Sequence, residues 1–104
     1  MKVINEINQP KSNIDINNLI RMQEIAYIYQ TTKQMKKSKK YHEIIVKICD
    51  STTKNEKILI LKIDSLNYLN KSYKSLEATK ELLNLNPYNL EALINIINYL
   101  NKKY

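Results

Sequence analysis

The heptapeptide Asn-Tyr-Leu-Asn-Lys-Ser-Tyr at residues 67–73 recurs at residues 98–104 as Asn-Tyr-Leu-Asn-Lys-Lys-Tyr, with one position changed. The tripeptide Lys-Lys-Tyr at residues 39–41 is a weaker copy, which precedes the first by nearly the same spacing. Each strong copy also closes a stretch that has the apolar spacing of a helix. A repeat of about 30 residues is typical of arrays of stacked helix pairs. The repeat therefore predicts such an array.

The apolar residues on either side of the repeat predict helices. They recur at intervals of three and four from Asp15 onward, and no segment has the period-two alternation of a half-buried strand. Polar segments near Ser38, at residues 51–56 and at residues 86–89 interrupt this pattern and predict turns. We therefore expect an all-α fold. The predicted helices are 15–36, 39–50, 55–70, 73–85 and 90–103.

Two sites have the residues of helix starts. Thr53 is followed three residues later by Glu56, which is the spacing of a capping box. Ser72 has a side chain that can accept a hydrogen bond from the first turn of the helix that follows it. These residues predict where two of the helices begin.

The length and composition limit the kind of protein. A chain of 104 residues suits one domain, which we expect at residues 15–104 after a flexible, polar lead-in at residues 1–14. The chain has no glycine. A phosphate-binding loop, a dinucleotide-binding turn, an EF-hand loop and a nucleophile elbow all need glycine where the backbone bends sharply or approaches a ligand. These four kinds of site are therefore excluded.

The turn motifs resemble those of a known repeat family. The segment Asn-Pro-Tyr-Asn-Leu-Glu-Ala-Leu at residues 86–93 is similar to the Asp-Pro-x-Asn-x-x-Ala-x segment that joins tetratricopeptide repeats. Residues 69–73, Leu-Asn-Lys-Ser-Tyr, resemble the family's Leu-Gly-x-Tyr turn, with asparagine in place of glycine and one residue added. The resemblance implies a right-handed array of antiparallel helix pairs. About five helices would make two and a half such repeats, with a period shorter than the family's 34 residues.

The asparagines in the repeated turn take the place of the family's glycine. That glycine allows left-handed backbone where the first helix of a pair ends, and asparagine tolerates this conformation next best. Asn70 and Asn101 occupy this part of the two copies. We therefore expect both residues to have a positive φ.

The resemblance also implies a function, which is non-catalytic scaffolding. Members of the family bind a peptide or partner protein in a groove lined by the first helix of each pair. In each copy, polar residues at intervals of three, six and seven are expected to share one helix face, and an asparagine amide can both donate to and accept from a peptide backbone. The alternative is an ordinary solvated face. The candidate partner-binding residues are Asp64, Asn67, Asn70, Lys71, Asn95, Asn98, Asn101 and Lys102.

No set of residues in the sequence has the pattern of a catalytic site. His42 is the only histidine, and we expect a surface or partly packed side chain, while the adjacent Glu43 points elsewhere on the helix. Cys49 is the only cysteine and lies in an apolar stretch, so we expect a buried, inert thiol. We therefore expect neither catalysis nor a cofactor or metal.

The net charge of +7 opens an alternative function. A basic surface attracts phosphate, but only Arg21 can make bidentate contacts, and the other cations are lysines. Lysine contacts to phosphate would make the protein a nucleic-acid-binding module, which ranks below protein binding. The excess charge is also what a lysine-rich composition produces by itself. The candidate basic patch is Lys33, Lys36, Lys37, Lys39 and Lys40.

The last predicted helix has an apolar face without an expected cover, because the sequence stops at Tyr104 where another helix would begin. Such a face implies a longer array or a homodimer through this helix, and a homo-oligomeric structural element without a separate ligand is a further alternative function. The N-terminus lacks a secretory signal, and the longest apolar run, at residues 58–61, is too short to span a bilayer. We expect a cytoplasmic protein without membrane insertion. The uncovered residues are Leu93, Ile96, Ile97 and Leu100.

Overall fold

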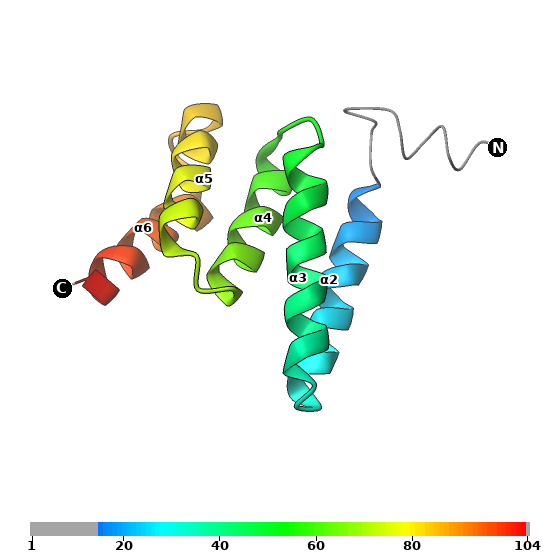
Figure 1. Cartoon of the computed structure of the whole chain (residues 1–104). Helices are drawn as coiled ribbons and strands as arrows, with labels where there is room; N and C mark the ends of the chain where they lie inside the picture. Colours follow the sequence, from blue (N-terminus) through cyan, green and yellow to red (C-terminus); the bar gives the residue numbers. More distant parts are fainter. Residues whose placement is uncertain (1–14, 104) are drawn as a thin grey trace.

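The computed structural model describes residues 15–103 and consists of five helices joined by short turns (Figure 1). No strand occurs among these described residues, so the predicted all-α fold is confirmed. Successive helices run in opposite directions, each packs against the next, and α2 also packs against α4. The expected lead-in at residues 1–14 lies outside the described residues. The helices are α2 (Ile16–Thr31), α3 (Met35–Asp50), α4 (Glu56–Tyr68), α5 (Ser72–Leu85) and α6 (Leu90–Lys103).

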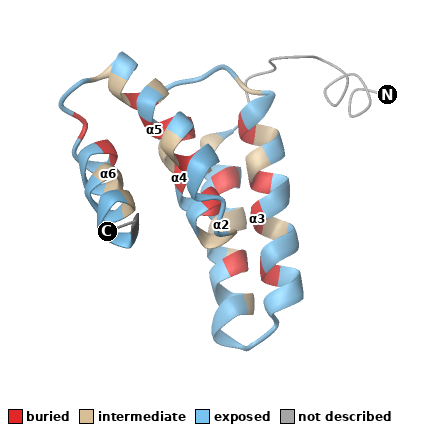
Figure 2. Cartoon of the chain, turned by 60° about the vertical axis from the view of Figure 1, so that its left-hand side comes forward, coloured by how far each residue is buried: buried red, intermediate tan, exposed pale blue. Residues whose placement is uncertain are grey.

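Helix α4 lies at the centre of the molecule and belongs to both parts of the hydrophobic core. One cluster joins α2, α3 and α4 around Leu19, Ile45 and Ile58, and the other joins α4, α5 and α6 around Leu59, Leu82 and Ala92. Six of the 13 residues of α4 are buried for this reason. In Figure 2 the buried residues follow the surfaces where neighbouring helices meet. None of the described helices is long and apolar enough to cross a membrane.

The first turn lies at residues 32–34 and not near Ser38. Lys33 has a φ of 62°, and the amides of Lys33 and Gln34 donate to the carbonyls of Gln30 and Tyr29, which closes the end of α2. Ser38 lies inside α3, where its buried hydroxyl donates to the carbonyl of Ala26 at 2.8 Å. These two small residues let α2 and α3 approach closely, so the predicted break near Ser38 is wrong.

The second turn follows the prediction for Asn70, which has a φ of 60°. The amide of Lys71 donates to the carbonyl of Leu66 at 2.9 Å, and that of Asn70 donates to the carbonyl of Asn67 at 3.0 Å. This pair of bonds is a Schellman motif, in which asparagine takes the position that glycine usually occupies. The prediction is wrong for Asn101, because that residue continues α6 as ordinary helix.

The helix starts differ from those predicted. Asn55 and not Thr53 caps α4, since its side chain accepts from the amide of Ile58 at 3.0 Å. Helix α5 begins after Lys71 without a side-chain cap, so Ser72 is the first residue of the helix and not its cap. Asparagine caps a helix at least as well as threonine does. The local sequence therefore did not show which of Thr53 and Asn55 is the cap.

The turn between α5 and α6 is tied to the start of α4. Asn89 caps α6, because its Oδ1 accepts from the amide of Ala92 at 3.0 Å. The Nδ2 groups of Asn89 and Asn86 both donate to Glu56 Oε1, at 2.9 and 3.0 Å. These two hydrogen bonds, the one from Asn89 being the stronger influence, lower the pKa of Glu56. The turn at residues 86–89, which the sequence predicts, is thus fixed against the first residue of α4.

Candidate functional site

The largest group of predicted binding residues lines a hollow where α4, α5 and α6 meet. Five of the eight candidates contribute to it, together with two serines and a tyrosine, and its volume is about 440 Å³. Among the described side chains, Lys102 is its one charged lining residue. We call this feature the polar hollow. Its lining residues are Asn67, Ser72, Ser75, Asn95, Asn98, Tyr99, Asn101 and Lys102.

Asn95 holds the polar hollow together. Its Nδ2 group donates to Ser75 Oγ at 3.1 Å and to Thr79 Oγ1 at 2.7 Å, both on α5. Its Oδ1 accepts from Asn67 Nδ2 at 2.8 Å, which connects α6 to α4. Both donor hydrogens of Asn95 are therefore committed to the fold. This residue positions the helices and is not free to bind a ligand.

Other amides in the polar hollow remain available. Asn98 and Asn101 are exposed, and within residues 15–103 their side chains make no hydrogen bond. Asn67 uses one of its two amide hydrogens for Asn95, which leaves the other hydrogen and the Oδ1 acceptor. Lys102 is exposed at the same edge of α6. The hollow thus presents donors and acceptors beside one positive charge.

Three predicted residues lie elsewhere. Helix α4 ends at Tyr68, so Asn70 and Lys71 follow the helix, and the prediction that they share one helix face with Asp64 and Asn67 is wrong. Asn70 ends the helix through its positive φ. Lys71 instead lines a second hollow, of about 510 Å³, between α3, α4 and α5. The positive φ expected for Asn70 was the signal in the sequence, because a left-handed residue ends the helix and redirects the chain after it.

Asp64 is a surface residue of α4, and its carboxylate is partly shielded from water near Glu91 of α6. Partial burial of its carboxylate raises its pKa, and the negative charge of Glu91 raises it further. Two like charges from different helices therefore lie near enough to repel one another. This arrangement is unfavourable for stability and does not provide a positive contact for an acidic ligand.

The second hollow was not expected from the sequence. Lys62 of α4 forms an ion pair with Asp50 of α3 at 2.6 Å, and its side chain is only 15% exposed. Lys54 and Glu81 form another ion pair at 2.7 Å. In the sequence, the only sign of this ion pair is a charged residue, Lys62, between the apolar residues Leu61 and Ile63. Its partner Asp50 could not be identified from the sequence, because it lies on another helix. The mixed charges of this surface give no preference for a ligand of one sign.

His42 is buried, contrary to the expected surface or partly packed position. Its Nδ1 lies 2.9 Å from Ser65 Oγ, and its ring stacks on Tyr68 with centroids 4.2 Å apart. Gln23 donates to Leu61 O at 3.0 Å and to Ser65 Oγ at 3.3 Å. Burial lowers the pKa of His42. Ser65 is 0% exposed, so this serine–histidine pair is closed to substrate and instead connects α2, α3 and α4.

The prediction for Cys49 is confirmed, because the thiol is buried. Burial, together with the negative charge of Asp50, raises its pKa to about 11, and Lys62 opposes this shift. The thiolate is therefore scarce at neutral pH. Within residues 15–103, no three His, Cys, Asp or Glu side chains gather in a way that could hold a metal ion.

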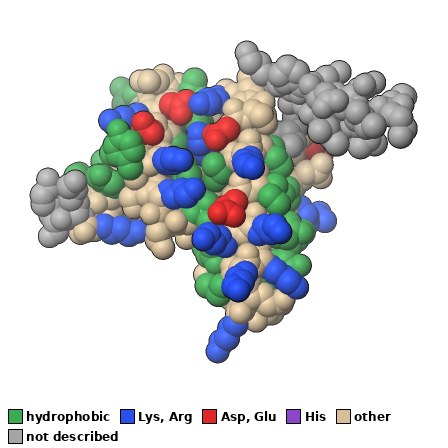
Figure 3. Space-filling view, in the orientation of Figure 1, with side chains coloured by type: hydrophobic (Ala, Val, Ile, Leu, Met, Phe, Trp, Pro, Cys, Tyr) green, Lys and Arg blue, Asp and Glu red, His purple; other side chains and the backbone are tan. Residues whose placement is uncertain are grey.

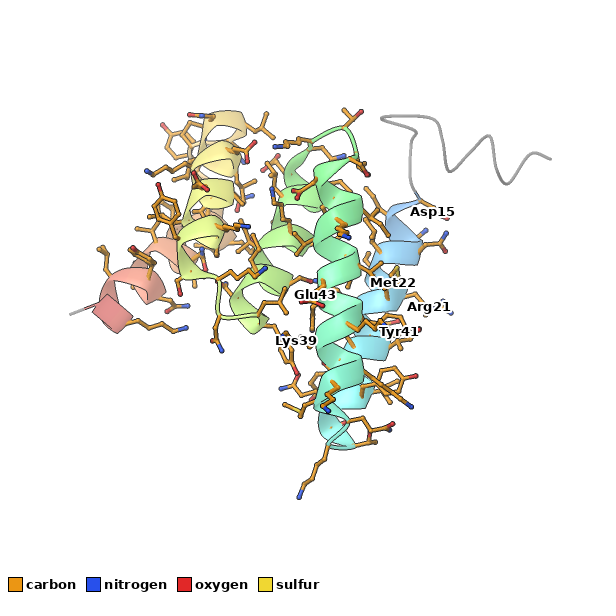
Figure 4. All side chains as sticks on the ribbon, viewed as in Figure 1. Asp15, Arg21, Met22, Lys39, Tyr41 and Glu43 are labelled. Atoms are coloured by element: carbon orange, nitrogen blue, oxygen red, sulfur yellow. The ribbon has the colours of Figure 1, made fainter. Side chains whose placement is uncertain are left out.

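The five lysines of the predicted basic patch lie at one end of the α2–α3 hairpin, which we call the basic tip. All five are exposed, and none belongs to an ion pair within the described part of the chain. Figure 3 shows lysines around this projecting end. Figure 4 shows Lys39 on the side of α3 toward α4, whereas Tyr41 points toward α2, where it contacts Tyr29. Lys37 lies 5.5 Å from the centre of the Tyr29 ring.

The apolar end predicted on the last helix lies on α6. Leu93, Ile97 and Leu100 are exposed, and Ile96 is half-buried against the rest of the molecule.

Comparisons with protein-family models, with curated proteins and with solved structures found no match to this chain. The resemblance to tetratricopeptide repeats therefore stays a prediction from the turn motifs.

Proposed function

We propose that this chain is a non-catalytic, tetratricopeptide-like scaffold that binds an extended segment of another protein in the polar hollow. One observation carries the proposal: Asn98, Asn101 and part of Asn67 have free amide groups on a surface held in shape by Asn95. An extended peptide presents alternating N–H and C=O groups, which amide side chains match as both acceptors and donors. The expected setting is the cytoplasm.

The geometry favours backbone recognition over recognition of one particular side chain. The hollow is open, most of its lining residues carry an amide or hydroxyl group, and its volume of about 440 Å³ is within the range of ligand sites. Its lining lacks an arginine that could clamp a carboxylate in a bidentate manner. We therefore expect modest affinity, with tolerance for different peptide sequences.

The test is selection of displayed random peptides on the immobilised full chain, followed by fluorescence anisotropy with a selected peptide. Replacing Asn98 and Asn101 by alanine should weaken binding at least about tenfold, or ~1.4 kcal/mol. The matched control replaces Asn17 and Asn18, which are exposed asparagines on α2. Equal affinity of the two double variants, or failure to select any peptide, would reject the proposal.

A second candidate function is supported by the basic tip. Its five lysines are exposed, and no acidic residue occurs between Glu24 and Glu43. Lysines that contact phosphates release counterions, so binding of RNA or DNA should weaken steeply with added salt. An electrophoretic shift at low salt that disappears in K36E/K40E, but not in the control K57E/K80E, would support this function. No shift at low salt would reject it.

A further inference from the structure

The lysines of the basic tip lie on three sides of α3. Ser38 is fully buried and its hydroxyl bonds to α2, so this residue marks the side of α3 that faces α2. A helix turns by about 100° per residue, which places Lys37 and Lys39 on opposite flanks of Ser38. Lys36 and Lys40 are four residues apart and share the remaining side, away from α2. The positive charges therefore surround the end of α3 instead of forming one flat surface.

Two tyrosines lie beside one of these lysines. Tyr41 is four residues after Lys37 on the same flank of α3, and its ring contacts that of Tyr29 on α2, with centroids 5.6 Å apart. Lys37 Nζ lies 5.5 Å from the centre of the Tyr29 ring. Both rings are only partly buried, and Figure 4 shows Tyr41 on the side of α3 toward α2. We call Tyr29 and Tyr41 the tyrosine pair. A cation that can contact phosphate thus lies next to an aromatic surface that is partly open to solvent.

We propose that the basic tip binds single-stranded and not double-stranded nucleic acid, with the phosphates on the lysines and unpaired bases stacked on the tyrosine pair. The inference rests on the nucleic-acid-binding function proposed above for the same lysines. Sites for single strands combine a positive surface that follows the backbone with aromatic side chains on which bases stack. The end of the α2–α3 hairpin carries both features.

A duplex can use only part of this arrangement. Double-stranded DNA is stiff, with a persistence length of about 50 nm, so it lies straight against one side of a helix end. The lysines on the opposite flank then point away from it. The bases of a duplex are also stacked on one another and do not reach the tyrosine pair. A single strand bends around the helix end and can place unstacked bases on aromatic rings.

The expected binding has little sequence preference. Contacts to phosphate position a strand without reading its bases, and every base has a face that can stack on tyrosine. Arg21 is the only arginine in the sequence, and it lies outside the basic tip, 3.5 Å from Glu24. The tip therefore lacks the bidentate side chain that most often reads guanine. We expect similar affinity for single strands of different sequence.

Fluorescence anisotropy at low salt tests the proposal with the full chain and labelled probes of equal length. A length of about 12 nucleotides is within the ~4–16 nucleotides typical of single-strand sites. The probes are oligo(dT), oligo(U), a DNA duplex, and an abasic strand that has the same phosphates without bases. At least one of the two single strands should bind about fivefold or more tightly than the duplex and the abasic strand, since one stacked base accounts for that factor. The tighter of the two shows whether DNA or RNA is the source.

Variants separate the roles of the rings and the lysines. Tyr41→Leu should weaken oligo(dT) binding about fivefold or more and leave abasic-strand binding unchanged, whereas Tyr41→Phe, which keeps an aromatic ring, should bind like the parent chain. Lys37→Gln and Lys39→Gln, on opposite flanks, should each reduce the slope of log affinity against log salt by about 0.7. Circular dichroism checks that the variants fold. If Tyr41→Leu does not fold, the comparison of probes on the parent chain decides.

The outcomes distinguish this inference from the function on which it rests. Duplex binding as tight as single-strand binding, or equal affinity for the abasic strand and oligo(dT), would overturn single-strand recognition and leave nucleic-acid binding in place. No binding of any probe at low salt would overturn both.

Discussion

Asn67 and Asn95 are joined by a hydrogen bond of 2.8 Å between Nδ2 of the first and Oδ1 of the second. The sequence repeat pairs Asn67 with Asn98, which opens the second copy, but the fold pairs it with Asn95, one helical turn earlier. This contact is the side-chain link between α4 and α6 beside the polar hollow. The first prediction follows from it.

Replacing Asn95 by alanine should lower the free energy of unfolding by about 1–2 kcal/mol. The change removes two hydrogen bonds to α5 and one to α4 at a partly buried position. Urea unfolding measures the loss, and hydrogen exchange should show faster opening of α6. The control Asn98→Ala, at an exposed position, should change stability by less than about 0.5 kcal/mol. Equal effects of the two changes would contradict the role given to Asn95.

Replacing Lys33 by glycine should make the folded chain more stable. A side chain with a φ of 62° has a steric cost that glycine avoids, although glycine loses more entropy on folding. We expect Lys33→Gly to stabilise the chain by about 0.5–1 kcal/mol, measured by thermal unfolding. Lys36→Gly, inside α3, should instead destabilise it by about 1 kcal/mol. A loss of stability in Lys33→Gly would contradict the left-handed turn.

Asn70→Val should destabilise the chain by about 1–2 kcal/mol, because a β-branched residue is unfavourable at a φ of 60°. Asn101→Val is the matched change in the second copy of the repeat, where the backbone is helical. Its effect should be no more than about 0.5 kcal/mol. Urea unfolding of both variants compares them directly, and similar losses would contradict the difference between the two turns.

Stability should fall as the pH decreases below about 6.5, the ordinary pKa of histidine. The folded state lowers the pKa of His42, so below 6.5 the unfolded chain binds a proton that the folded chain excludes. The contribution is complete above 6.5 and is lost as pH falls toward the folded-state pKa. His42 is the only histidine in the sequence. The urea midpoint of His42→Gln should therefore depend less on pH between about pH 5.5 and 7 than that of the parent chain. An unchanged slope in this variant would reject the assignment.

Asp64→Asn should raise the thermal midpoint at neutral pH, because the folded state raises the pKa of Asp64 through burial and through Glu91. A carboxyl group whose pKa is raised on folding stabilises the chain at low pH and loses that contribution as pH rises through the folded-state value. The gain from the substitution should therefore disappear near pH 3.8, the ordinary value for this group. Glu77→Asn, at an exposed position on α5, is the control. A gain that is independent of pH would contradict the electrostatic cause.

The sequence by itself determined the helical class and the turn at residues 86–89, which depend on interactions within about one helical turn, such as apolar spacing and capping. It did not determine the positive φ of Asn70, because the identical Asn-Tyr-Leu-Asn-Lys segment around Asn101 continues a helix. The same local reasoning misplaced the first turn. Ser38 has a turn-forming side chain, but its hydroxyl bonds to Ala26 on the neighbouring helix.

Only the tertiary structure decided which residues meet across helices. It pairs Asn67 with Asn95, buries His42 beside Ser65, and leaves Asn98 and Lys102 in the polar hollow. Such contacts depend on the rotation and register of one helix against another, and the repeat in the chain does not fix either of them. Local sequence therefore predicts most of the helices, whereas the packing of the helices determines which residues form the candidate site.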